Sequence, residues 1–212
     1  LRDWSADILV LVFGAYDVAD RHERAKASFE AFSTYLSELI ADRRRTPRDD
    51  LLTRLVGARD EQEALSEEEV IATVILLLFG GHETTTNLIA NGTLALLEHP
   101  EERRRLERDP ELWPRAVEEL LRWDGPSKAM WRVARTAVRV GQATFEPGEK
   151  LLLVQASANR DPEAFDDADR LDVGRPKNPH CGFGFGIHYC LGAPLARAEG
   201  RIAIRRLLER FP

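Results

Sequence analysis

The chain has 212 residues, of which 43% are hydrophobic and 31% charged, a balance that predicts a globular protein with a substantial core. Its formal net charge of -6 argues against nucleic acid as a partner, because phosphate-binding surfaces are usually basic. Two cysteines, Cys181 and Cys190, are too few for a secreted disulfide scaffold, so we expect a reducing, cytoplasmic location.

Two helices are predicted in the N-terminal third of the chain. The opening stretch LRDWSADILVLVFGAYD has a short apolar core but neither a basic leader nor a small-residue cleavage site, so we do not expect a signal peptide. Residues 21–45 repeat apolar side chains with helical period and end in three arginines, which suit a helix C-terminus. A short helix is expected in DDLLTRLVGA, ending near Gly57.

A long helix is predicted from about residue 67 to residue 98. Ser66 and Glu69 form an S-x-x-E capping box at its start, and a proline follows His99. Its first half is apolar on every face, which predicts a central, buried helix. The apolar run Val70–Gly81 is too short to span a bilayer, so no membrane association is expected.

The remainder of the chain alternates short helices with a β-region. PEERRRLERD and WPRAVEELLRW read as helices, the second with Pro114 in its first turn. Residues 131–156 are rich in β-branched residues and contain a Pro147-Gly148 turn, which predicts a small sheet. An irregular segment at 157–182 precedes a helix at 193–210. The predicted fold class is therefore mainly α with a small β-region.

Two adjacent glycines lie in the middle of the predicted long helix, where glycine lowers helix stability. Each glycine inside a helix costs about 1 kcal/mol relative to alanine, and Gly80 and Gly81 are followed by His82, Glu83 and Thr84. One reading is close helix–helix packing at the glycines, with Glu83 at the surface. The other is a groove for a flat ligand, beside an acid–alcohol pair that handles protons.

A second constellation is EELLR. Glu119 and Arg122 are three residues apart on one helix face, and Glu118 and Arg122 are four apart, so either glutamate could pair with the arginine. The simpler interpretation is an exposed ion pair that contributes a few tenths of a kcal/mol.

The third constellation is FGFGIHYCLG, residues 183–192. Cys190 falls just before a predicted helix, where unpaired N–H groups and the helix dipole would stabilise a thiolate. The alternatives are a buried, inert cysteine or a zinc site, whose four ligands would be His180, Cys181, His188 and Cys190. The zinc reading fits the usual ligand spacing poorly and leaves the glycines unexplained.

These three constellations resemble the cytochrome P-450 family of haem-thiolate monooxygenases. The cysteine loop of that family is Phe-x-x-Gly-x-x-x-Cys-x-Gly, and Phe183, Gly186, Cys190 and Gly192 match every fixed position. The Glu-x-x-Arg motif of the family and its oxygen-binding groove are matched in the same order along the chain, by Glu119 and Arg122 and by Gly80, Gly81, His82, Glu83 and Thr84.

The resemblance implies haem b (iron protoporphyrin IX) as the cofactor. Cys190 would be the proximal ligand of the haem iron, as in the thiolate-ligated haem proteins. The glycines of the loop would let the backbone lie flat beneath the porphyrin. His188 and Arg132 would contact the haem propionates.

The resemblance also assigns roles away from the cysteine. Glu83 and Thr84 would be the acid–alcohol pair that delivers protons during oxygen activation. Glu119 and Arg122 would be a buried structural pair joined by a third arginine, for which three candidates remain open: Arg160, Arg170 and Arg175.

The implied function is insertion of one oxygen atom from O2 into a small organic substrate. Electrons would come from NAD(P)H through ferredoxin reductase and ferredoxin. The match to soluble bacterial members spans residues 1–212 but only the C-terminal portion of the family fold, so one partial domain is expected. The alternatives are a haem-binding module without turnover and a truncated, non-catalytic fragment.

A basic stripe is a candidate docking face for the ferredoxin. Arg197, Arg201 and Arg205 recur at four-residue steps and so share one face of the last helix. Ferredoxins are acidic, and a basic patch would steer their approach. The alternative is that these arginines pair with nearby acids such as Glu199 and Glu209.

Overall fold

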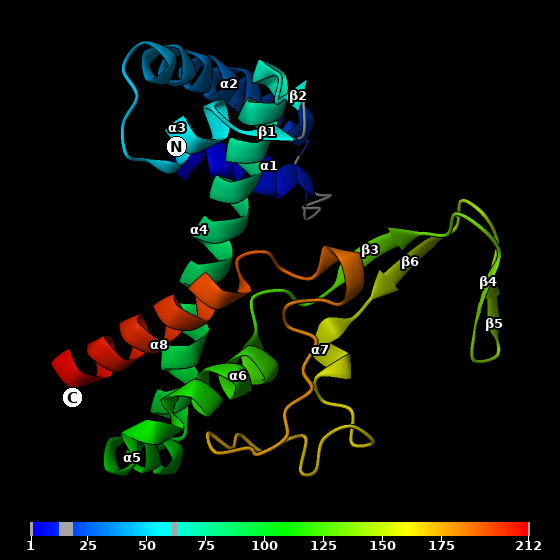
Figure 1. The fold of residues 1–212 in the computed structure, drawn as a ribbon. Coiled ribbons are helices and arrows are strands. Elements are labelled where there is room, and N and C mark those ends of the chain that lie inside the picture. Colours follow the sequence, from blue (N-terminus) through cyan, green and yellow to red (C-terminus); the bar gives the residue numbers. More distant parts are fainter. Residues whose placement is uncertain (1, 13–18, 61–62, 212) are drawn as a thin grey trace. The chain divides into compact units, whose positions relative to one another are not determined.

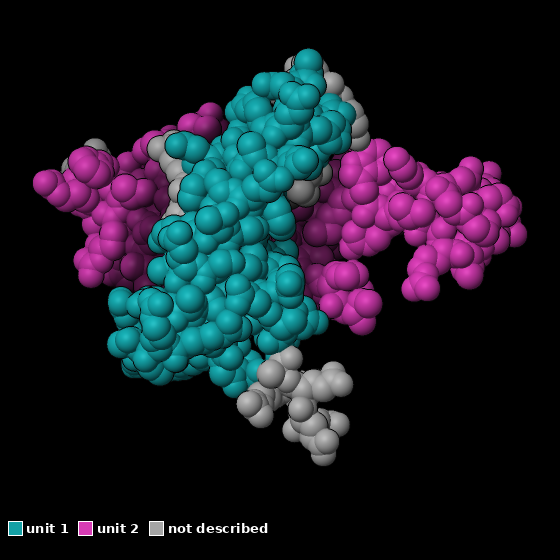
Figure 2. All heavy atoms as spheres, turned by 90° about the horizontal axis from the view of Figure 1, so that it is seen from above, with its two compact units in different colours: residues 1–82 teal, residues 83–212 magenta. Residues whose placement is uncertain are grey.

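The computed structural model describes residues 2–12, 19–60 and 63–211. It divides into two compact units, residues 1–82 and 83–212, which are coloured separately in Figure 2. The boundary falls within one continuous helix, α4 (Glu67–Glu98). The expectation of a single partial domain stays a prediction.

The first unit is a helical cluster with one small ladder (Figure 1). α1 and α2 pack against each other, and their core is built on Phe32, Leu36 and Ile75. Of the opening stretch, residues 1 and 13–17 lie outside the described residues. Besides the start of α4, the elements are α1 (Arg2–Val12), α2 (Arg21–Arg45), α3 (Leu51–Val56), β1 (Arg59–Asp60) and β2 (Glu63–Ala64).

Helix α4 begins as the sequence predicts. The Ser66 backbone N–H donates to the Glu69 carboxylate at 2.8 Å, and the Glu69 N–H donates back to the Ser66 hydroxyl at 3.2 Å, so both halves of the capping box form.

The expectation that the first half of α4 is buried is wrong in this structure. Val70 and Ile75 are buried, but Leu76 is 67% exposed and Leu77 and Leu78 are exposed as well. A single helix can bury only the faces that neighbouring elements cover, and hydrophobicity on all faces does not supply those neighbours.

The core of the second unit is helical. It is built around α6, α8 and the second half of α4 (Figure 1). A Cβ on Gly92 would lie 2.8 Å from Ile204 Cδ1, and one on Gly200 would lie 2.9 Å from Leu88 Cδ2. A Cβ at either glycine would therefore have to displace a buried side chain where α4 and α8 approach each other. The helices are α5 (Pro100–Arg108), η1 (Pro110–Leu112), α6 (Trp113–Asp124), α7 (Gln155–Ala158), η2 (Gly186–His188) and α8 (Ala193–Arg210).

The β-region forms two separate ladders. β3 (Met130–Val133) pairs antiparallel with β6 (Lys150–Leu153), and β4 (Val138–Val140) pairs antiparallel with β5 (Ala143–Phe145). A turn lies at Pro147-Gly148, as expected, with Gly148 at φ +91°. The predicted fold class, mainly α with a small β-region, is confirmed. Within the described residues, no helix is long and apolar enough to cross a bilayer.

Candidate functional site

The cysteine loop, residues 183–192, has a defined backbone shape. Gly184 and Gly186 adopt φ values of +72° and +70°, a left-handed conformation that only glycine adopts without strain. The Cys190 N–H donates to the Phe183 carbonyl at 2.9 Å, and the Tyr189 N–H donates to the Gly186 carbonyl at 3.0 Å. The loop therefore folds back on itself and fixes the backbone of Cys190.

One face of this loop is apolar and open. Phe185, Ile187 and Leu191 are 92%, 98% and 86% exposed. Among the described atoms nothing lies within 4 Å of a Cβ placed on Gly186, and one placed on Gly192 would lie 3.9 Å from Cys190 Sγ. An exposed apolar patch of this kind marks a binding surface. These residues would fit a flat apolar cofactor on the loop, and Cys190 would be available as a ligand to its metal.

Cys190 also lies where the sequence predicts, three residues before the start of α8. Pro194 occupies the first turn of α8 and the Ala196 N–H donates to the Gly192 carbonyl at 2.9 Å. Neither cysteine is in a disulfide, and both are half-buried.

Glu119, and not Glu118, is the partner of Arg122. The Arg122 guanidinium donates to both Glu119 oxygens at 2.7 and 2.8 Å, and both side chains are 0% exposed. Arg175 is the third member, since its Nε donates to Glu119 at 3.0 Å. Arg160 instead stacks on the Trp123 ring, 3.7 Å from its centroid.

The two arginines also tie down the irregular segment. Arg122 donates to the carbonyls of Asn159, Ala168 and Arg170, and Arg175 donates to those of Asp166, Asp167 and Arg170. Buried guanidinium groups thus supply the hydrogen bonds that this segment lacks from secondary structure.

Glu118 belongs to a different network, which the sequence did not predict. It accepts two hydrogen bonds from Arg197, at 2.6 and 2.9 Å, and lies 3.0 Å from His180 Nε2. Burial alone would raise the pKa of Glu118, but the hydrogen bonds from His180 and Arg197 outweigh it and lower that pKa to about 2. The only sequence feature that could have indicated this network is the pair of adjacent glutamates, because neighbouring residues on a helix point in different directions and so meet different partners.

The zinc alternative is disfavoured by the contacts of His180. Its Nε2 faces Glu118, and its Nδ1 accepts the Gly182 N–H at 3.1 Å, so both ring nitrogens are engaged. In the part of the chain that the structure describes, no three His, Cys, Asp or Glu side chains lie close enough to hold a metal ion.

The predicted groove residues lie on α4 on both sides of the unit boundary. Gly80 and Gly81 belong to residues 1–82, and Glu83 and Thr84 to residues 83–212. No described atom lies within 4 Å of a Cβ placed on either glycine, so close helix–helix packing does not explain them here. Glu83 is half-buried and Thr84 exposed.

The two predicted propionate contacts both have exposed side chains. Arg132 lies on β3 and donates to the Trp131 carbonyl at 2.8 Å, and His188 lies in η2 within the cysteine loop. Both side chains are accessible to an anionic group.

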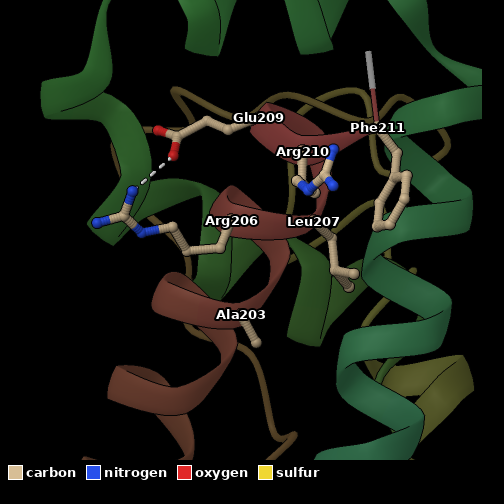
Figure 3. A pocket seen from close by; sticks show the side chains of 6 residues that line it. All are labelled: Ala203, Arg206, Leu207, Glu209, Arg210 and Phe211. Atoms are coloured by element: carbon tan, nitrogen blue, oxygen red, sulfur yellow. Dashed lines mark hydrogen bonds and ion pairs between the residues drawn. The ribbon is translucent and has the colours of Figure 1, made fainter.

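The basic stripe on α8 is partly neutralised. Arg197 is paired with Glu118, and Arg205 donates to Glu209 at 2.8 Å. The second pair agrees with the alternative interpretation, in which the arginines of the stripe pair with nearby acids such as Glu209. Arg206 reaches the same carboxylate at 3.1 Å (Figure 3). Arg206 and Glu209 border an open cavity of about 640 Å³ at the C-terminal end of α8. Cys190 precedes the N-terminal end of this helix and does not line the cavity.

Comparison with known proteins gives consistent matches. The family model described as Cytochrome P450 matches residues 8–212. Cytochrome P450 107B1 of Saccharopolyspora erythraea is 47% identical over 212 residues, which is 100% of this chain and 50% of that protein. Mycinamicin IV hydroxylase/epoxidase of Micromonospora griseorubida is 47% identical over 192 residues, 90% of this chain and 48% of that protein. The chain spans about half the length of these curated relatives.

Solved structures agree with the sequence matches. The cytochrome P450 PksS of Bacillus subtilis has a TM-score of 0.92 at 40% identity and covers 100% of this chain and 53% of its own. CYP109E1 from Bacillus megaterium has a TM-score of 0.89 at 37% identity, with 100% and 56% covered. The resemblance and the partial fold inferred from the motifs are confirmed, and the chain belongs to the cytochrome P450 family.

Proposed function

We propose that this chain is the haem-binding portion of a monooxygenase that inserts one oxygen atom from O2 into a small organic substrate. The observation that carries the proposal is the cysteine loop, whose fixed backbone presents an apolar face beside Cys190. Bound haem would supply the oxygen activation that no side chain can perform, through a thiolate-ligated iron.

The residues of this chain would each have a limited task. Cys190 would provide the thiolate ligand, and Phe183, Gly186 and Gly192 would shape the loop beneath the cofactor. His188 and Arg132, both exposed, would hold the propionates by charge-assisted hydrogen bonds. Gly80 and Gly81 leave space beside α4 that a side chain would fill.

Glu83 and Thr84 would handle protons in this site. A carboxylate and a hydroxyl at adjacent positions can pass a proton toward a bound oxygen molecule. A haem-binding module without turnover would have no need for the pair, so its presence favours the enzyme over the non-catalytic alternative.

Electrons would arrive from NAD(P)H through ferredoxin reductase and a ferredoxin. The exposed Arg201 and Arg205 are the members of the α8 stripe best suited to meet an acidic carrier, since Arg197 is held by Glu118. We also place the protein in the cytoplasm, because its two cysteines are free thiols.

The experiment that tests the proposal compares two cysteine variants. The haem-loaded protein should show the red-shifted carbonyl band of a thiolate ligand after reduction and exposure to carbon monoxide. Cys190→Ala should abolish this band, and Cys181→Ala should keep it. The opposite result would assign the ligand to Cys181 and overturn the proposed site.

A further inference from the structure

One carboxylate holds both arms of the cysteine loop. Glu118 lies on α6, His180 lies in the segment that enters the loop, and Arg197 lies on α8, which follows it. Glu118 accepts both bonds of the Arg197 guanidinium and the bond from His180, at 2.6, 2.9 and 3.0 Å. Bidentate guanidinium–carboxylate pairs fix geometry as well as charge. The chain on either side of Cys190 is therefore attached to the same point.

These contacts lead directly to the backbone of the cysteine. The His180 Nδ1 faces the Gly182 N–H at 3.1 Å and its Nε2 faces the Glu118 carboxylate at 3.0 Å, so the ring links the loop backbone to this glutamate. The Arg197 guanidinium lies over the Phe183 ring, 4.6 Å from the centroid. The Phe183 carbonyl in turn accepts the Cys190 N–H at 2.9 Å. A shift of either arm would move the residue that holds Cys190.

We infer that Glu118, His180 and Arg197 are positioning residues for the thiolate ligand, distinct from the network centred on Glu119. The inference rests on the proposed function, since it concerns the geometry of Cys190 toward a bound haem. In the described part of the chain, no hydrogen-bond partner of Glu118 is also a partner of Glu119. Contacts around a metal ligand orient it and tune the metal, so their loss should change the properties of the iron.

The test uses haem-loaded protein and three kinds of variant. Glu118→Gln removes the charge, Arg197→Lys keeps the charge but loses the planar fork, and His180→Phe removes the donor. His180→Gln retains a donor near the Nε2 position and serves as the conservative rescue. Glu209→Gln and Arg205→Lys make the same chemical changes in an exposed pair on α8, and are the matched controls.

The readouts are the carbonyl spectrum and the midpoint potential of the haem. Glu118→Gln, Arg197→Lys and His180→Phe should each increase several-fold the fraction of reduced protein that shows the thiol-type carbonyl band, and should shift the potential to more positive values. His180→Gln should lie nearer to wild type than His180→Phe. The two control variants should match wild type in both readouts.

Three outcomes decide the matter. Lower melting temperatures with an unchanged band and potential would reduce the cluster to a structural one and overturn the inference. If Glu118→Gln yields no haem-loaded protein, the comparison of His180→Phe with His180→Gln decides. A carbonyl band and potential nearer to wild type in His180→Gln support the inference, and equal values in the two variants overturn it. A wild-type protein without any thiolate band would instead refute the proposed function itself.

Discussion

Replacement of Glu119 by glutamine should be the most damaging single change in the second unit. The variant has the same shape but no charge, and it leaves Arg122 and Arg175 without their shared carboxylate. Wild-type Glu119 accepts five N–H bonds, from Arg122 Nε and Nη2, Arg175 Nε, the Asp172 backbone and Asn178 Nδ2. A glutamine amide would turn its NH2 group toward some of these donors, where it cannot accept.

The size of the effect follows from burial. Glu119 and Arg122 are both 0% exposed, so water cannot replace the lost partner. Removal of one partner from a buried ion pair costs about 3–5 kcal/mol. Because folded proteins are stable by only about 5–15 kcal/mol, this change removes much or all of that margin. We therefore expect little folded, haem-loaded protein from Glu119→Gln.

The assay is urea unfolding followed by far-UV circular dichroism, together with haem content per chain. Glu209→Gln is the control, since Glu209 accepts from two arginines as well but is exposed, and its midpoint should stay near wild type. An unfolding free energy for Glu119→Gln within about 1 kcal/mol of wild type would refute the argument from burial.

Three further predictions concern protons, electrons and acid. Thr84→Ala in the complete enzyme should keep haem and substrate but divert reducing equivalents to peroxide, and unchanged product per NAD(P)H would contradict the proton role. Arg201→Glu with Arg205→Glu should slow reduction by ferredoxin and flatten its salt dependence while dithionite reduction stays normal; a wild-type rate and salt slope would remove the docking role. The pKa of Glu118 is lowered from 4.5 to about 2, so its contribution to stability is full above about pH 4.5 and is lost as the pH falls toward 2. Glu118→Gln should therefore be less stable than wild type at neutral pH, with a gap in urea midpoint that closes across this window; a constant gap would be evidence against the linkage.

Local signals in the sequence were sufficient for the boundaries of the three longest helices, whereas α1 (Arg2–Val12) and the short α7 (Gln155–Ala158) were not predicted. The helices at 21–45, 67–98 and 193–210 agree with the structure in full. Each of these ends is set by residues within a few positions of it, such as the Ser66–Glu69 box and the glycine and proline that precede and open α8. Such signals need no knowledge of the rest of the fold.

Features that depend on distant partners were not accessible in the same way. The exposed leucines of α4 could not be foreseen, because burial depends on which elements cover a face. The choice of Arg175 over Arg160 or Arg170 depends on the path of the irregular segment, which follows no period. The pairing of Arg197 with Glu118 joins residues 79 positions apart.

The Glu-x-x-Arg motif indicated the network of Glu119 but not the network of the adjacent Glu118. Successive helix residues point about 100° apart, so Glu119 enters the core while Glu118 faces the cysteine loop and α8. The first holds two arginines that fix the irregular segment, and the second holds the two arms of the loop around Cys190. Helix α6 therefore contacts both the irregular segment and the two arms of the cysteine loop, although α6 precedes Cys190 by about 70 residues in the chain. A change in the packing of α6 would alter both networks at once, whereas substitution of Glu118 or Glu119 alone should disturb only the network to which that glutamate belongs.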